Sequence, residues 1–334
     1  MKIQPTYVTV VSLGLGLLLS SCRQEPLPEQ GGGGRAVFAV SETIPDLETK
    51  STGAESVNLA DGRVLAMEQW LPVREGATKA SAVYASADAT PLGGTPIAVW
   101  AYNLSAADAA VSAWKVDDGS ASGAVQASYS GGKWITSVPY NSSKRAASWF
   151  TRWFALAPYG AIGSGVTLGS IADGTAPTLS YTVPASVTSQ PDLMLASTAA
   201  RGVDDKTDIG LSFSHVLTGI RLAADDGVNL TSATLSGVYD RASLNLLTRE
   251  WSGLEKSKTT PSFTQNGSFD QNAGVFMMLP QWLPAGAKLT LTVDGDTVEA
   301  DLSGHEWKMG KLVTYRVAVP HKAGEHSIRP PREE

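Results

Sequence analysis

Cysteine is nearly absent from this chain: its 334 residues contain only Cys22, so no disulfide can form within one molecule. Charge is scarce too, because Asp, Glu, Lys and Arg make up 17% of the residues, against about 25% in an average soluble protein. The hydrophobic share of 43% excludes a disordered chain and allows cores that hold by packing alone. The net charge of −6 argues against a nucleic-acid binder and against a polybasic membrane-surface protein. The length predicts two domains of ordinary size.

The common sequence signatures of catalysis are missing as well. The chain has no G-x-S-x-G, no H-E-x-x-H and no Walker-type loop, and the glycine run 31–34 lacks the Lys-Ser/Thr pair of a phosphate loop. His215 lies beside Phe213 in an apolar strand pattern, so we expect a hydrogen-bonded core histidine there rather than a catalytic one. We therefore predict no enzyme, no catalytic residue, no cofactor and no metal site.

The first 21 residues predict a secretory signal. Lys2 precedes an apolar run at 7–19, which is too short to span a membrane as a helix, because spanning needs about 20 residues. The sequence Leu19-Ser20-Ser21-Cys22 resembles a bacterial lipobox, which implies cleavage before Cys22 and acylation of that residue. A plain signal peptide with an incidental cysteine is the alternative. Residues 22–35, which contain proline and a glycine run, are expected to form a flexible tether.

Strand signals dominate the rest of the chain. Short apolar or alternating runs lie at 36–40, 96–102, 149–156, 211–222, 275–279, 289–293 and 311–319. Asp294-Gly295-Asp296 is a hairpin turn signal, and the polar stretch 201–208 lacks apolar periodicity, which places a domain boundary there. The predicted fold class is all-β, with β-sandwich domains at 36–205 and 206–320 and a polar tail at 321–334.

Five segments together resemble the fimbrillin family, the subunits of type V pili. They are WFALAPY (153–159), LSYTVPASVTSQPDLMLA (179–196), LSFSHVL (211–217), FMMLPQWLPAGAKLTLT (276–292) and WKMGKLVTY (307–315). Each is only a strand or turn, but their order and spacing cover about 36–320. The resemblance implies two tandem transthyretin-like β-sandwich domains in a structural subunit of a bacterial surface fimbria that contributes to adhesion. It also implies a surface-exposed lipoprotein of the outer membrane that enters the fimbria after processing.

The resemblance further implies assembly with other fimbrial subunits by strand exchange. In that family an arginine-specific protease removes an N-terminal strand with the lipid anchor, and a strand of the next subunit fills the groove. Here that strand would lie near 36–40, with cleavage at Lys50, at Lys79 as a second candidate, or at Arg35, Arg63 or Arg74 as fallback sites. The tail contains a proline pair and many charges, so it is a poor donor strand and favours a minor subunit at the tip or base. Stalk, tip and anchor positions all stay open.

A second function class stays open beside the pilus subunit. The nine tryptophans fit core packing, because most of them lie inside strand patterns, but an exposed one could stack on a sugar. The alternative is therefore a cell-surface lipoprotein or pilus-tip adhesin that binds a host protein or glycan.

Overall fold

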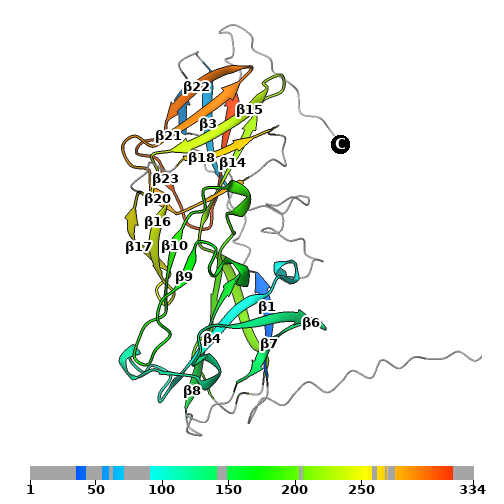
Figure 1. The fold of residues 1–334 in the computed structure, drawn as a ribbon, viewed down its shortest axis with the longest axis vertical. Coiled ribbons are helices and arrows are strands. Elements are labelled where there is room, and N and C mark those ends of the chain that lie inside the picture. Colours follow the sequence, from blue (N-terminus) through cyan, green and yellow to red (C-terminus); the bar gives the residue numbers. More distant parts are fainter. Residues whose placement is uncertain are drawn as a thin grey trace, which may run out of the picture.

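The computed structural model describes residues 35–42, 55–59, 63–70, 91–140, 149–202, 205, 207–257, 262–267, 269 and 275–318. These residues form strands and single-turn 3-10 helices, and no α-helix occurs among them. The short helices are η1 (Pro91–Gly94), η2 (Val111–Ala113), η3 (Asp118–Ser120), η4 (Tyr159–Ala161) and η5 (Val187–Ser189). The predicted all-β class is therefore confirmed, and the strands build an elongated molecule (Figure 1).

The first module is a sheet that closes on itself. Its strands are β1 (Arg35–Glu42), β4 (Ile97–Leu104), β5 (Lys115–Val116), β6 (Val125–Ser130), β7 (Lys133–Pro139), β8 (Phe150–Ala157), β11 (Met194–Ser197), β12 (Arg201–Gly202) and β13 (Ile209–His215). The order is β12-β8-β11-β13-β1-β7-β6-β4-β5, and β8 also pairs with β4. That extra pairing closes seven strands into a barrel-like ring, a closure that the expected sandwich did not include. Phe38, Val99, Leu211 and Phe213 belong to the buried cluster of this ring.

A second sheet packs on the outside of the ring. It consists of β9 (Val166–Leu168), β10 (Thr178–Thr182), β16 (Arg241–Asn245) and β17 (Glu250–Glu255), in the order β17-β16-β10-β9. Trp100 and Tyr102 of β4 share a buried cluster with Leu179 and Tyr181 of β10. Because the ring interior covers one face of β4 and this sheet covers the other, all eight residues of β4 are buried. Its continuously apolar sequence follows from that double burial.

The second module is a pair of facing sheets. One has the order β19-β14-β24-β3-β2, from β19 (Val275–Met278), β14 (Thr218–Ala224), β24 (Leu312–Ala318), β3 (Val64–Trp70) and β2 (Glu55–Asn58). The other has the order β18-β15-β21-β22, from β18 (Ser262–Asn266), β15 (Leu230–Ser236), β21 (Lys288–Val293) and β22 (Asp296–Asp301). A two-stranded ribbon, β20 (Gln281–Trp282) with β23 (Glu306–Trp307), completes the set. Alternating buried residues of both sheets meet between them, as the period of two requires.

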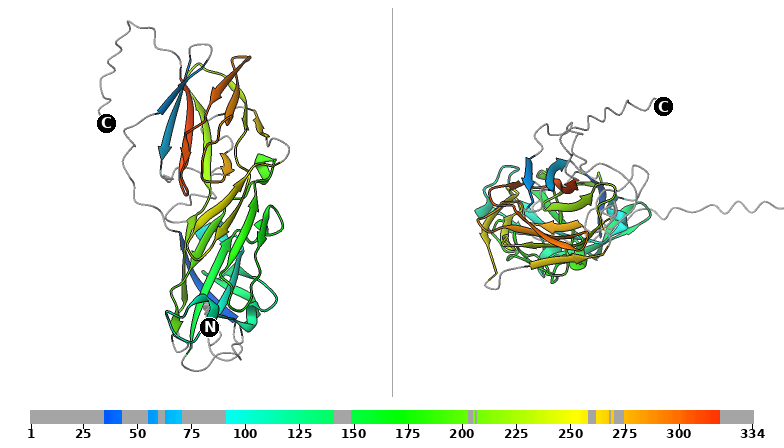
Figure 2. Two further views of the ribbon diagram at one scale, coloured as in Figure 1. Left: turned by 90° about the vertical axis from the view of Figure 1, so that its left-hand side faces the viewer. Right: turned by 90° about the horizontal axis from the view of Figure 1, so that it is seen from above.

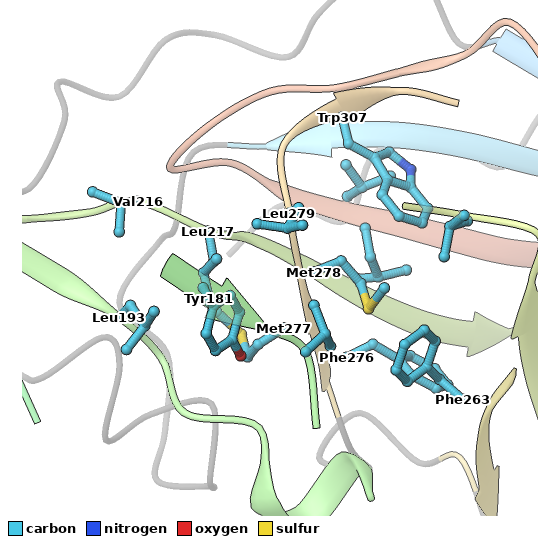
Figure 3. Packing of buried hydrophobic residues seen from close by; sticks show 14 of the residues in the cluster. Tyr181, Leu193, Val216, Leu217, Phe263, Phe276, Met277, Met278, Leu279 and Trp307 are labelled. Carbon is cyan, nitrogen blue, oxygen red and sulfur yellow. The ribbon is translucent and has the colours of Figure 1, made fainter. Parts of the chain in front are cut away.

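One hydrophobic cluster runs through the joint between the modules. Figure 3 shows Tyr181, Leu193 and Leu217 leading toward Phe276 and Trp307 without a break. The indole Nε1 of Trp307 donates to the hydroxyl of Tyr315 at 2.9 Å, so this buried polar group is paired. The shared core couples the packing of the two modules.

The N-terminal segment divides between the two modules. β1 lies in the ring, whereas β3 pairs antiparallel with β24 over seven residues, from Val64↔Ala318 to Trp70↔Leu312. In Figure 2 the blue strands of 55–70 accordingly lie beside the red β24, at the opposite end from β1. The hairpin at 55–70 is thus part of the second module's sheet, although it precedes the predicted boundary near 205. The limits 36–205 and 206–320 stay predictions.

Leu65 tests how firmly this hairpin belongs to the second module. Its side chain is 0% exposed, so Leu65→Ala should lower the free energy of unfolding by about 2–5 kcal/mol in urea titrations. Val138→Ala is the control, because Val138 is 41% exposed on β7 and its truncation should cost less than about 0.5 kcal/mol. Equal effects of the two substitutions would mean that the hairpin does not support the core.

Candidate functional site: the seat of the first strand

β1 occupies a slot between two strands that are remote from it in sequence. It runs parallel to β13, with the register Phe38↔Ile209 to Glu42↔Phe213. It runs antiparallel to β7, with Val37 opposite Ile135 and a register shift between Arg35 and Val37. Without β1, β7 and β13 would each present an unpaired row of N–H and C=O groups. The slot is therefore a strand-binding site, filled here by the chain's own N-terminal segment.

Apolar side chains hold the first half of β1. Ala36, Val37 and Phe38 are all buried, which shows that both faces of the strand are covered at this end. The ring of Phe38 meets Trp153 edge to face, with centroids 5.1 Å apart and an interplanar angle of 81°. Burial of a Val or Phe side chain stabilises by about 1.5–3 kcal/mol each. A replacement strand would need apolar side chains of similar size at these positions.

Polar contacts fix β1 near both ends. The backbone N–H of Ala36 donates to Thr136 Oγ1 at 3.0 Å. Glu42 Oε1 accepts from the backbone N–H of Leu92 at 2.5 Å. Leu92 has φ 53°, a left-handed conformation that is costly for a residue with a Cβ. Glu42 therefore ties the last residue of β1 to a strained turn at the start of η1.

His215, the last residue of β13, lies in a buried ion pair. Its Nδ1 is 3.2 Å from Asp192 Oδ1 and 2.9 Å from Oδ2, and the two side chains are 10% and 9% exposed. Burial by itself lowers the pKa of His215, but the charge and hydrogen bond of Asp192 and the charge of Glu42 outweigh it, so the pKa lies above its ordinary value. The predicted hydrogen-bonded histidine is confirmed. The carboxylate of Glu42, the last residue of β1, thus helps to raise the pKa of His215.

A further ion pair joins the two strands that flank β1. Lys133 Nζ of β7 contacts Asp208 Oδ2, which directly precedes β13. This pair links the two flanking strands in addition to their pairing with β1. Sequence analysis missed Thr136, Asp192 and Glu42, because a single polar residue in or beside a strand carries no pattern of its own.

One of the predicted site residues, Arg35, lies in the strand that fills this seat. Arg35 is the first residue of β1, and its side chain is exposed. Cys22, Lys50 and Lys79 fall outside the described residues, as do the signal segment and the tail. In sequence, Lys50 lies between β1 and β2, and Lys79 follows β3. The hairpin of β2 and β3 was not predicted, although Asp61-Gly62 between them is a turn signal that could have revealed it.

The described residues offer neither a metal site nor a membrane-spanning helix. Within the described ranges no three His, Cys, Asp or Glu side chains come together in a way that could hold a metal ion. In the same part of the chain no helix has the length and apolar character needed to cross a bilayer.

Known proteins resemble this chain over most of its length. A family model described as fimbrillin-like matches residues 87–328. The chain is similar to a candidate cell adhesion protein from Bacteroides ovatus, with 14% identity, a TM-score of 0.47, and coverage of 85% of this chain and 91% of the other. It is also similar to a fimbrial assembly protein from Parabacteroides distasonis, with 11% identity, a TM-score of 0.34, and coverage of 69% and 85%. No curated protein matches it in sequence. The family match begins after β3, so all three N-terminal strands precede it.

The raised pKa of His215 predicts a pH dependence with a definite sign. The pair stabilises the fold fully below the ordinary histidine pKa, and this contribution is lost as pH rises through the raised value in the folded protein. Asp192→Asn should therefore lower the His215 pKa and flatten the decline of the unfolding free energy with rising pH. Glu42→Gln should lower the His215 pKa by less than Asp192→Asn does. NMR titration of the imidazole and urea unfolding at several pH values measure both effects. Asp226→Asn, an exposed control, should leave the titration unchanged; an equal shift there would contradict this assignment.

Proposed function

Because this chain belongs to the fimbrillin-like family, it is a surface fimbrial subunit that contributes to adhesion, and we propose that its copies assemble by strand exchange at the seat of β1. The observation that carries the proposal is the position of β1 between β7 and β13. When β1 leaves this slot, it exposes two unpaired strand edges and an apolar groove. An incoming strand pairs with the two edges and fills the groove. Head-to-tail donation is heterologous, so it gives an open filament.

The proposal also covers the finer architecture and the anchor. The two modules correspond to the tandem transthyretin-like β-sandwich domains of the resemblance, the first of them carrying the seven-strand ring. Cys22 is the lipidated residue that holds the precursor at the outer membrane, facing outward, before processing. Residues 22–35 tether that anchor to β1. The family places the protein at the cell surface in any case.

The strand pairing separates three of the candidate cleavage sites, Arg35, Lys50 and Lys79. A cut after Arg35 leaves most of β1 in its slot. A cut after Lys79 detaches β1, β2 and β3 together and withdraws the buried side chains of Leu59, Leu65 and Met67 from the second module's core. Three such side chains are worth about 5–9 kcal/mol, of the order of the net stability of a domain. A cut after Lys50 frees β1 alone, and we propose it as the processing site.

Limited digestion of the lipid-free precursor, carrying Cys22→Ser, tests this assignment. A lysine-specific protease should produce a new N-terminus at Ser51 together with oligomers that survive mild detergent, because the emptied seat takes a neighbour's strand. Lys50→Ala should abolish both products, while the matched variant Lys79→Ala should leave them intact. N-terminal sequencing and electron microscopy give the readouts. Oligomers that form equally well from Lys50→Ala, or a mature chain that begins at Ala80, would sink the assignment.

Trp282 favours a second, ligand-binding role. Trp100, Trp134 and Trp307 are each 1% exposed, whereas Trp282 is 65% exposed. Its position is fixed, because β20 pairs with β23 and the side-chain amide of the preceding Gln281 bonds Tyr239 N and O at 2.8 and 3.1 Å. An exposed aromatic ring on a backbone that is fixed in this way suits stacking on a sugar or contact with a host protein. This supports the alternative of a tip adhesin.

Glycan-array and cell-adhesion measurements test the role of Trp282. Trp282→Ala should weaken binding about tenfold or more without changing the unfolding transition, since the side chain is exposed. Met309→Ala is the matched control, an apolar side chain that is 39% exposed on the turn after β23. Equal binding by all three proteins would remove Trp282 from consideration as a contact residue.

A further inference from the structure

The hairpin of β2 and β3 occupies a seat of its own in the second module. Its strand β3 pairs with β24 through seven residues, and β2 forms the outer edge of that sheet. The fimbrillin-like match spans 87–328, so it includes β24 but not the hairpin that covers it. The sheet that contains β24 is thus completed by a segment that lies outside the region of the family match.

The seat is specific for this hairpin. Leu59, Leu65 and Met67 enter the same buried cluster as Val313, Tyr315 and Val317 of β24. Between β2 and β3, Arg63 Nη1 forms an ion pair with Asp294 Oδ2 at 2.9 Å, and the Arg63 side chain is only 14% exposed. Asp294 Oδ1 also accepts from the backbone N–H of Asn229 at 2.9 Å, which fixes the turn between β21 and β22. Backbone pairing, three apolar anchors and a charge pair together define the seat.

The connections of the hairpin change when the chain is cut after Lys50. In the intact chain the hairpin is tied to the first module on both sides, through residues 43–54 to β1 and through residues 71–90 to the strands after η1. After the cut only 71–90 remains, and at about 3.3 Å per residue that stretch reaches at most about 66 Å. The cut turns a hairpin fastened at both ends into a terminal arm.

We propose that this arm is exchanged between copies: the β2–β3 hairpin of one subunit completes the β24 sheet of the next subunit. Every copy has the same seat, so the contacts made in a neighbour equal those made at home, and only the entropy of the connection distinguishes the two states. Each copy gives one hairpin and accepts one, which extends a chain of subunits in one direction. The proposal rests on the proposed function, because the cut after Lys50 releases the arm. It adds a second exchanged element, which pairs with β24 of the second module and not at the seat of β1.

Ala66 and Arg316 face each other across β3 and β24, and neither side chain is fully buried, so a cysteine at each position can report the pairing. Two full-length proteins, Ala66→Cys and Arg316→Cys, each also carrying Cys22→Ser, are mixed in equal amounts, cut after Lys50 and oxidised. Exchange between copies should convert about half of the reporter cysteines into disulfides that join one variant to the other. The control mixture, Thr234→Cys with Thr290→Cys, places the reporters on the directly paired strands β15 and β21 and should give none.

Three outcomes decide the proposal. Mixed disulfides in the test pair but not in the control pair support it. Polymers that form after the cut without mixed disulfides overturn it, while leaving exchange at the seat of β1 intact. Absence of both polymers and mixed disulfides overturns this proposal and the proposed function together.

A second readout does not depend on cysteine geometry. An excess of a synthetic peptide of residues 51–70 should compete for the seat and shorten the polymers at least severalfold. The same peptide with Leu65→Asp should have no effect, since it places a charge where a fully buried leucine belongs. Polymers of unchanged length with both peptides would overturn the proposal whether or not the reporter disulfides form.

Discussion

The first module's ring closes only where β1 pairs with β7 on one side and β13 on the other. All other links of the ring, including the β4–β8 pairing, join strands that follow Ile97 in sequence. A backbone edge inside a packed core must find hydrogen-bond partners, and an open ring would leave two such edges beside an apolar groove. The completeness of this module therefore depends on a strand that a single cut can detach from everything after it.

The strands of the ring other than β1 are held in place by additional contacts. β4 and β8 are held on both faces, by the ring interior and by the β9–β10–β16–β17 sheet, and the joint with the second module shares the same buried cluster. These strands form the scaffold against which β1 docks. A scaffold that keeps most of its packing when one strand leaves can present a formed groove instead of collapsing into it. The second module repeats this relation, because β24 is backed by β14 and the facing sheet while the hairpin covers its other side.

Sequence patterns predicted the strands well and their partners poorly. The runs at 96–102, 149–156, 275–279, 289–293 and 311–319 all coincide with observed strands, because burial imposes its period locally. Asp294 and Gly295 adopt the positive φ values, 53° and 90°, that their hairpin signal predicts. The ring closure, the parallel β1–β13 pair and the Arg63–Asp294 ion pair were not foreseen. Each depends on which distant edge a strand meets, and a single sequence carries no local signal for that choice. The sequence predicted only part of the seat of β1, namely a strand from Ala36 to Val40 and a hydrogen-bonded histidine at position 215.

The long separation in sequence between β1 and β13 bears on the exchange that we propose for this strand. Pairing of Phe38 with Ile209 closes a loop that contains most of the first module, so its entropic cost is paid before its contacts form. The β6–β7 hairpin, by contrast, pairs residues close in sequence, and its β7 supplies one of the two edges on which β1 lies. Once the chain between β1 and β2 is broken, the strand loses its covalent advantage over any other extended segment that carries matching side chains. In the proposed exchange, selection between its own strand and a neighbour's then depends on local concentration and side-chain fit.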